Sequence, residues 1–203
     1  MYKVGITGGI ATGKSTITNY LIEKNLPVID CDILAREALE KGTAAYKAVI
    51  NKFGSEIKQK DAQIDRSKLA NIVFNDEDKR KDLERVVHEH VLRNVQSQLR
   101  GYISNKEPLV FIDIPLLFEV KWQFLVDEIW VIYCDQQKQI NRMINRDDLS
   151  IDEAKSRLSA QIDIKEKKKL GDVIISSSQS YEDMFKEVNQ ELSRLSKKLD
   201  INI

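Results

Sequence analysis

Cysteine is scarce in this sequence, which has two, Cys31 and Cys134, among 203 residues. Two cysteines cannot form a disulfide framework, and no CxxC pair of the kind that binds metals is present. Each cysteine lies at the end of an apolar run, so we expect buried thiols in a reducing compartment and predict a cytoplasmic protein.

Net charge is absent as well, because 32 lysines and arginines balance 32 aspartates and glutamates. A balanced chain lacks the general positive field that holds nucleic acid. We therefore expect no nucleic-acid partner, and any bound anion must be held by a local cluster of basic groups.

Long hydrophobic runs are also missing. The most apolar stretch, residues 109–118, is interrupted by Asp113 and Pro115, so we predict no membrane span. Strand character begins at Tyr2, which leaves no room for a cleavable leader and argues against secretion. With 42% hydrophobic residues the chain is long enough for one α/β domain with insertions, and we expect residues 1–203 to form a single domain.

One motif is present in full: residues 8–15, GGIATGKS, match the phosphate-loop pattern GxxxxGK[ST]. A run with strand character, residues 2–7, precedes it and a helix-compatible segment, residues 14–24, follows it, which is the context that such a loop needs. Gly8 and Gly13 allow a tight turn, because a residue without Cβ adopts positive φ at low cost. The motif predicts a nucleotide site, and the alternative is a glycine-rich turn beside a surface lysine.

The backbone and the side chains of this loop have different expected roles. Amide groups at a helix N-terminus favour anions, so the loop backbone should hold phosphate oxygens. Lys14 would reach the β- and γ-phosphates, the Ser15 hydroxyl would bind Mg²⁺, and Thr16 would add a phosphate-side hydroxyl. The residues expected to contact the nucleotide are Gly9, Ile10, Ala11, Thr12, Gly13, Lys14, Ser15 and Thr16.

The second expected strand ends in an acidic tip, Asp30-Cys31-Asp32. Ligands of open parallel sheets gather at the carboxyl ends of the strands, so both aspartates are candidate site residues. Asp32 would orient an acceptor hydroxyl or hold Mg²⁺ through water, or else cap the helix predicted over residues 33–39. Arg36 would pair with Asp32 or reach an anionic substrate.

Residues 40–106 have apolar residues at helical spacing and no strand pattern, so we expect a helical insertion that forms the acceptor pocket. A buried strand follows over residues 109–114. Asp113, near its end, would reach Mg²⁺ directly or through water, or accept hydrogen bonds from loop amides. The three apolar side chains after it would wall a pocket or pack in the core. They are Leu116, Leu117 and Phe118.

A helix is expected from about residue 136, directly after a fourth strand over residues 128–133. Its Gln139, Arg142 and Arg146 share one face, which favours a lid that closes over the transferred phosphate and excludes water. The alternatives are a solvated surface, or pairing of the arginines with the two aspartates that follow Arg146.

The remaining segments complete the expected α/β pattern. Ser150 and Glu153 fit a capping box that opens the second helix of the lid. Residues 165–169, rich in lysine, are expected to be exposed charge. A fifth strand over residues 172–176 leads through a polar loop to an amphipathic helix over residues 181–199.

Over nearly the whole chain, residues 4–195, the sequence resembles the dephospho-coenzyme A kinase family. The matching segments are TGGIATGKST at 7–16, DCDILAR at 30–36, IDR at 64–66, residues 69–74, PLLFE at 115–119 and Gln139-x-x-Arg142-x-x-x-Arg146-Asp147. The chain departs from the family pattern at Cys31, at Glu89, and in the loop at 177–179.

This resemblance implies transfer of the ATP γ-phosphate to the ribose 3′-hydroxyl of dephospho-coenzyme A, the last step of coenzyme A synthesis. It also implies a phosphate-loop NTPase fold: a three-layer α/β/α domain with a five-stranded parallel sheet, a helical substrate-binding insert and a helical lid. The core would be residues 1–32, 107–138 and 170–203, the insert about 33–106 and the lid about 139–169. We expect Mg²⁺ as cofactor, ATP and dephospho-coenzyme A as substrates, and a monomer or weak homo-oligomer.

The expected site residues fall into three groups, and Asp32 matches the proposed catalytic carboxylate of the family. The catalytic group is Asp32, Lys14, Arg142 and Arg146. The acceptor group is Thr7, Asp32, Arg36, Leu116, Leu117 and Phe118. The metal group is Ser15 and Asp113.

Two other functions are consistent with the phosphate loop alone. The loop does not select the acceptor, so a kinase of another nucleoside, nucleotide or small metabolite is one alternative. A nucleotide-dependent switch ATPase is the other. The absence of an NKxD guanine signature, together with the acidic tip and the arginines of the lid, favours transfer to a small acceptor.

Overall fold

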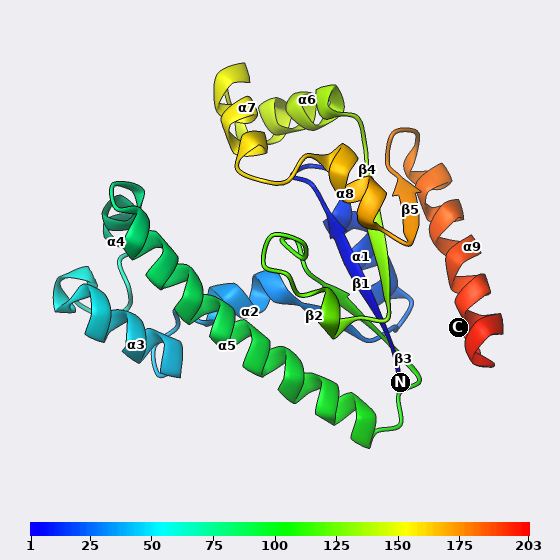
Figure 1. The fold of residues 1–203 in the computed structure, drawn as a ribbon, viewed down its shortest axis with the longest axis horizontal. Coiled ribbons are helices and arrows are strands. Elements are labelled where there is room, and N and C mark those ends of the chain that lie inside the picture. Colours follow the sequence, from blue (N-terminus) through cyan, green and yellow to red (C-terminus); the bar gives the residue numbers. More distant parts are fainter. The chain divides into compact units, whose positions relative to one another are not determined.

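The apolar runs of the sequence form one parallel sheet in the computed structural model, which describes residues 1–203 (Figure 1). The strands are β1 (Tyr2–Gly8), β2 (Val28–Asp30), β3 (Leu109–Asp113), β4 (Glu128–Tyr133) and β5 (Val173–Ser176). Their order is β2-β3-β1-β4-β5, all parallel. The expected α/β fold with a five-stranded parallel sheet is therefore confirmed.

Helices follow or separate these strands along the chain. They are α1 (Lys14–Glu23), α2 (Cys31–Glu37), α3 (Ala44–Phe53), α4 (Arg66–Phe74), α5 (Glu77–Ser104), α6 (Gln136–Asp147), α7 (Ile151–Ser159), α8 (Ile164–Leu170) and α9 (Tyr181–Leu199). Side-chain oxygens cap several N-termini, among them Asp65 on α4 and Ser180 on α9. No helix is both long enough and apolar enough to cross a membrane.

The chain divides into two compact units, residues 1–29 with 102–203, and residues 30–101. In the first unit, helices α1 and α9 bury their apolar faces on one side of the sheet. The core side chains are Val4, Ile6, Ile17, Leu21, Leu109, Phe111, Trp130, Ile132, Ile175, Met184, Val188, Leu192 and Leu195. The second unit has its own core of Val49, Phe53, Ile57, Ile64 and Leu69. The expected boundaries of the insert and the lid remain predictions.

Strand β1 lies at the centre of the sheet and sets the positions of the candidate site. Its register pairs Ile6 with Asp113 of β3 and Gly8 with Ile132 of β4. Since all strands run in one direction, Asp113 and the loop after Gly8 emerge at the same edge of the sheet.

A small helical layer formed by α6 and α7 packs beside the loop. Ile140, Met143 and Ala154 form its core, and Ile10 and Ala11 of the loop pack against them. The Ser150 hydroxyl oxygen accepts a hydrogen bond from the Glu153 amide, and the Glu153 carboxylate accepts one from the Ser150 amide, so the predicted capping box is confirmed.

Candidate active site

The phosphate-loop motif folds as a tight turn between β1 and α1. The amide and the hydroxyl of Thr12 both donate to the Gly9 carbonyl, at 3.3 and 2.9 Å. Gly13, at the N-cap of α1, has φ of 89°, a left-handed conformation that favours glycine. A Cβ on Gly8 would lie 2.7 Å from the Thr12 hydroxyl and 2.8 Å from the Ile132 carbonyl. The two motif glycines are thus required by the path of the backbone.

Lys14, the motif lysine, is held by an aspartate at the end of β3. Its ammonium lies 2.5 Å from Asp113 Oδ1, and the Thr18 hydroxyl donates to Asp113 Oδ2 at 2.6 Å. Asp113 is 1% exposed, and the neighbouring Ser15 is exposed at the start of α1. Asp113 therefore binds side chains of α1. Sequence reasoning missed Thr18, whose only signal was its place one helical turn after Lys14.

One face of α6 holds two consecutive carbonyls of the loop. The Gln139 amide donates to Ile10 O at 2.7 Å, and the Arg142 guanidinium donates to Ala11 O at 3.0 Å. Ala11 has φ of 58°, an uncommon conformation for a residue with a Cβ, and these contacts help to maintain it. The predicted face of α6 is present, and its first two members contact the loop backbone.

Arg142 also joins the loop to the residue after β5. It donates to the Ser177 carbonyl at 2.7 Å and to the Ser177 hydroxyl at 3.1 Å, and that hydroxyl donates to Thr12 O at 2.5 Å. The buried Cys134 sulfur lies 3.7 Å from the same guanidinium, and burial raises the pKa of this thiol, so it stays protonated.

Arg146, the third member of the face, is exposed and pairs with Asp147. Its guanidinium donates to both carboxylate oxygens, at 2.8 and 3.0 Å, and Arg157 approaches the same carboxylate at 3.5 Å. The hydrogen bond from Arg146 lowers the pKa of Asp147 and raises the pKa of the arginine. The alternative pairing that the sequence offered is therefore present, on a surface where such pairs are weak.

The segment after β3 contains the apolar residues expected to wall a pocket. Leu117 and Phe118 are buried in the core, whereas Leu116 is 36% exposed. The Thr7 hydroxyl donates to the Pro115 carbonyl at 3.1 Å, so it supports the turn that carries these residues.

In the second unit, the two aspartates of the acidic tip, Asp30 and Asp32, have different contacts. The Asp30 carboxylate accepts from the amides of Asp32 and Ile33, at 2.8 and 3.0 Å, so Asp30 is the N-cap of α2. The alternative in which Asp32 caps the helix is wrong, because α2 begins at Cys31, two residues before the predicted start, and Asp32 lies within its first turn. The side chains of Asp32 and Arg36 are exposed.

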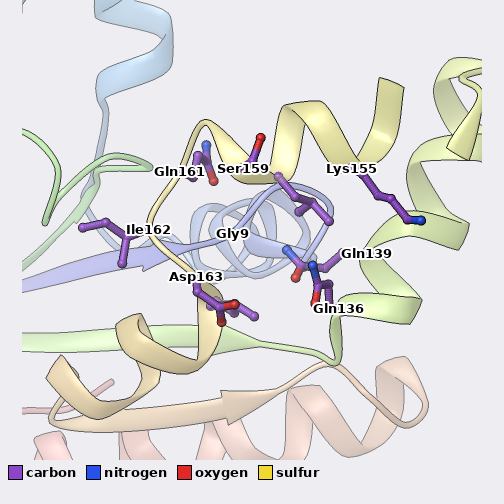
Figure 2. Close-up of a pocket in the computed structure, with 10 residues that line it drawn as sticks. Gly9, Gln136, Gln139, Lys155, Ser159, Gln161, Ile162 and Asp163 are labelled. Carbon is purple, nitrogen blue, oxygen red and sulfur yellow. The ribbon is translucent and has the colours of Figure 1, made fainter. Parts of the chain in front are cut away.

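A pocket of about 240 Å³ adjoins the loop at Gly9 (Figure 2). Its walls come from α6, α7, the segment between α7 and α8, and the start of α8. They are Gln136, Gln139, Lys155, Leu158, Ser159, Gln161, Ile162, Asp163 and Ile164. The side-chain amide oxygen of Gln161 is buried and has no hydrogen-bond partner. The pocket thus connects the phosphate loop with the segment that the sequence predicts to be a lid.

One residue of the lysine-rich run contradicts its prediction. Lys167 is 0% exposed and forms an ion pair with Glu119 at 2.8 Å. Residues 165–169 were expected to be exposed, but Lys167 follows the buried Ile164 by three residues and so shares its face of α8. That spacing was the only signal, and a lysine is rarely buried without a partner.

Comparison with known proteins gives a consistent assignment. Residues 2–183 match the model of the family described as dephospho-CoA kinase. A dephospho-CoA kinase of Oceanobacillus iheyensis is 47% identical over 180 residues, covering 89% of this chain and 90% of that protein. The solved structure of a Campylobacter jejuni dephospho-CoA kinase has a TM-score of 0.72 and 32% identity, covering 97% of this chain and 98% of its own. A crystal structure from Thermus thermophilus gives a TM-score of 0.80 with 32% identity, over 96% and 97% of the two chains.

Proposed function

This chain belongs to the dephospho-CoA kinase family, an ATP-using family that carries out the final step of coenzyme A biosynthesis, and from this premise we propose how its residues transfer the phosphate. The proposed reaction moves the γ-phosphoryl group of ATP to the ribose 3′-hydroxyl of dephospho-coenzyme A. The bond from the γ-phosphorus to the bridging oxygen breaks, a bond to the acceptor oxygen forms, and ADP leaves. The acceptor proton is released.

The triphosphate is held by the backbone of residues 9–16 and by Lys14. The observation that carries this proposal is the Lys14 side chain, fixed on buried Asp113 at the N-terminus of α1. Phosphoryl transfer needs alignment and neutralisation of oxygens more than covalent participation by the protein. A fixed cation beside an array of amides meets that need.

The donor set around Lys14 suits a magnesium ion. Mg²⁺ prefers oxygen ligands and keeps several waters, so it needs few protein groups besides the phosphates. The exposed Ser15 hydroxyl would bind the ion directly, and Asp113 would act through water, because its oxygens already accept from Lys14 and Thr18. When bound, the ion would neutralise charge on the phosphate oxygens.

The acceptor hydroxyl is oriented by Asp32. Because Asp30 caps α2, the carboxylate of Asp32 is not needed by the helix and is exposed. A sugar hydroxyl is too weak an acid for an ordinary aspartate to deprotonate beforehand, so its proton leaves late in the reaction. Orientation is then the larger contribution of Asp32. Arg36, one turn further along α2, would bind an anionic part of the acceptor.

Arg142 and Arg146 differ in their proposed contributions. Arg142 keeps the loop backbone in shape through Ala11 and Ser177. Arg146 is exposed and exchanges Asp147 for the transferred phosphate when the lid closes. Leu116, exposed beside the buried Leu117 and Phe118, would contact the acceptor.

Release of ADP from ATP, measured with a panel of acceptors and at several Mg²⁺ concentrations, tests this assignment. We expect ADP only when dephospho-coenzyme A is present, and a raised Mg²⁺ requirement in Ser15→Ala. Release with a different nucleoside or metabolite alone would support another small-molecule kinase. Release without any acceptor would support a switch ATPase, and either outcome would overturn the proposed reaction.

A further inference from the structure

Strand β1 ends on a carbonyl that its neighbouring strand cannot satisfy. Carbonyls alternate in direction along a strand, and on the β3 side Ile6 O accepts from the Ile114 amide at 2.9 Å. Gly8 O, two residues later, faces the same side. There β3 has ended at Asp113 and the chain turns from Pro115 onward. Because an unpaired backbone group is costly to bury, Gly8 O needs a donor from another part of the chain.

Lys167 supplies that donor. Its ammonium lies 3.3 Å from Gly8 O, 3.1 Å from Pro115 O and 2.8 Å from Glu119 Oε1. An ammonium has three donors and no acceptor, so three oxygens satisfy it fully. The side chain is 0% exposed, and its charge is compensated by Glu119.

Glu119 extends this contact to the segment between α7 and α8. Its Oε1 also accepts from the Ile162 amide at 3.1 Å, and Ile162 is a wall residue of the pocket beside Gly9. One ion pair, between the buried Lys167 and the partly buried Glu119, therefore joins the entry to the phosphate loop, the turn after β3 and the segment between α7 and α8. The phosphate-loop entry and the turn after β3 lie close to the residues proposed to bind ATP, because Asp113, which holds Lys14, is two residues before Pro115.

We propose that Lys167, together with Glu119, is a positioning residue for ATP. It fixes the positions of the phosphate-loop entry, the turn after β3 and the segment between α7 and α8 relative to one another. This inference rests on the proposed function, in which the loop binds the triphosphate. A buried ion pair is by itself weak evidence of a contribution to stability, since the cost of removing both charges from water offsets their attraction. The proposed positioning role comes instead from the hydrogen bonds that Lys167 donates to the Gly8 and Pro115 carbonyls, because these bonds are directional.

Lys167→Met tests the proposal, because methionine preserves the length of the side chain and removes all three donors. Lys169→Met is the matched control: Lys169 lies on the same helix, is exposed, and pairs only with Glu166 at the surface. Steady-state kinetics should be measured for ATP and for dephospho-coenzyme A, on protein shown by circular dichroism to be fully folded at the assay temperature. We expect the KM for ATP to rise on the order of tenfold to a hundredfold, as for a misplaced catalytic group. The KM for dephospho-coenzyme A should rise less than the KM for ATP, because Lys167 reaches the acceptor site only through the turn that carries Leu116.

A double variant keeps the test decisive if Lys167→Met alone does not fold. Lys167→Met with Glu119→Leu leaves no buried charge, so its fold is not penalised by an unpaired carboxylate. We expect the same selective rise in the KM for ATP. A folded variant with wild-type KM for ATP and wild-type kcat would overturn the proposal and leave the pair a structural contact. Failure of the wild-type protein to bind ATP would instead overturn the proposed function.

Discussion

The Lys14 ammonium lies 2.5 Å from the buried Asp113 carboxylate, which joins the end of β3 to the first turn of α1. Thr18 donates to the other carboxylate oxygen at 2.6 Å and fixes the aspartate from the opposite side. The motif lysine is therefore restrained by side chains of the protein itself. A preordered cation does not lose side-chain entropy when the phosphates arrive.

Replacing this lysine should remove most of the catalysis. In Lys14→Ala we expect kcat to fall by on the order of 10² to 10³, about 3–4 kcal/mol, as when one preorganised charge-stabilising donor is lost. Steady-state ADP release measures the change. Lys24→Ala, at the exposed end of α1, serves as control and should retain wild-type turnover. Near-normal kcat in Lys14→Ala would exclude the loop lysine from the mechanism.

The exposed carboxylate of Asp32 should affect chemistry rather than ATP binding. Asp32→Asn keeps the size of the side chain and removes its charge, so we expect loss of most of kcat with an unchanged dissociation constant for ATP. Titration calorimetry and turnover together measure both. Asp30→Asn is the control, because asparagine also caps helices well and should maintain α2. If kcat is unchanged in Asp32→Asn, the residue has no role in orienting the acceptor.

Arg142 should be sensitive even to a substitution that keeps its charge. Its planar guanidinium donates to Ala11 and Ser177 together, and a lysine ammonium cannot reproduce that fork. We expect Arg142→Lys to lower the free energy of unfolding by about 1–3 kcal/mol and to raise the KM for ATP. Thermal melting and kinetics check the two effects.

Arg146→Met should affect stability less than Arg142→Lys does, because of the position of Arg146. Its side chain is 63% exposed and its pair with Asp147 is a surface contact, so stability should change by less than about 1 kcal/mol. Only kcat should fall. Equal destabilisation by the two substitutions would contradict the separate contributions assigned to these arginines.

Stability at acid pH should depend on Glu128, which joins β4 to α9 and β1. Burial raises the pKa of Glu128, but hydrogen bonds from Arg194, Trp130 and Tyr2 lower it more, to below the ordinary 4.5. A lowered pKa stabilises the folded state above pH 4.5, and this contribution is lost as the pH falls through the folded pKa.

Glu128→Gln should therefore destabilise the protein above about pH 4.5 and have little effect at strongly acid pH. We expect a loss of about 1.5–3 kcal/mol at pH 7, which is about 2–4 °C in Tm per kcal/mol for a chain of this size. The difference in Tm between variant and wild type should narrow progressively below pH 4.5. A difference that stays constant down to pH 3 would show that the charge of Glu128 is not its source.

The sequence predicted those parts of the fold that depend on local pattern. The strand over residues 128–133 and the helix over residues 181–199 have the expected bounds, because apolar periodicity and capping residues determine them. The capping box at Ser150 is confirmed for the same reason. The strand order β2-β3-β1-β4-β5 was not predicted, since strands joined by long crossovers carry no local signal of their neighbours.

Contacts between distant segments could not be predicted in the same way. The partners of Lys167 lie 48 or more positions away along the chain, and a lysine run gives no sign that one member is buried. Arg142 was assigned to the lid by its face, but its contacts with Ala11 and Ser177 depend on how three segments meet. Asp32 was offered only as an alternative N-cap, and the cap is Asp30. Aspartate suits that position in either place, so the sequence pattern does not fix where the helix begins.

Transfer of the γ-phosphoryl group to the ribose 3′-hydroxyl is tested most directly by following the phosphate itself. ATP labelled with ³²P at the γ-position is incubated with the wild-type protein, Mg²⁺ and dephospho-coenzyme A, and the labelled product is separated by chromatography. The position of the new phosphate is assigned by ³¹P magnetic resonance on a parallel reaction with unlabelled ATP. We predict that all transferred label is on the ribose 3′-hydroxyl, at a rate that falls on the order of 10²-fold or more in Lys14→Ala. Label in inorganic phosphate, or on any other hydroxyl group, would contradict the proposed transfer to the ribose 3′-hydroxyl.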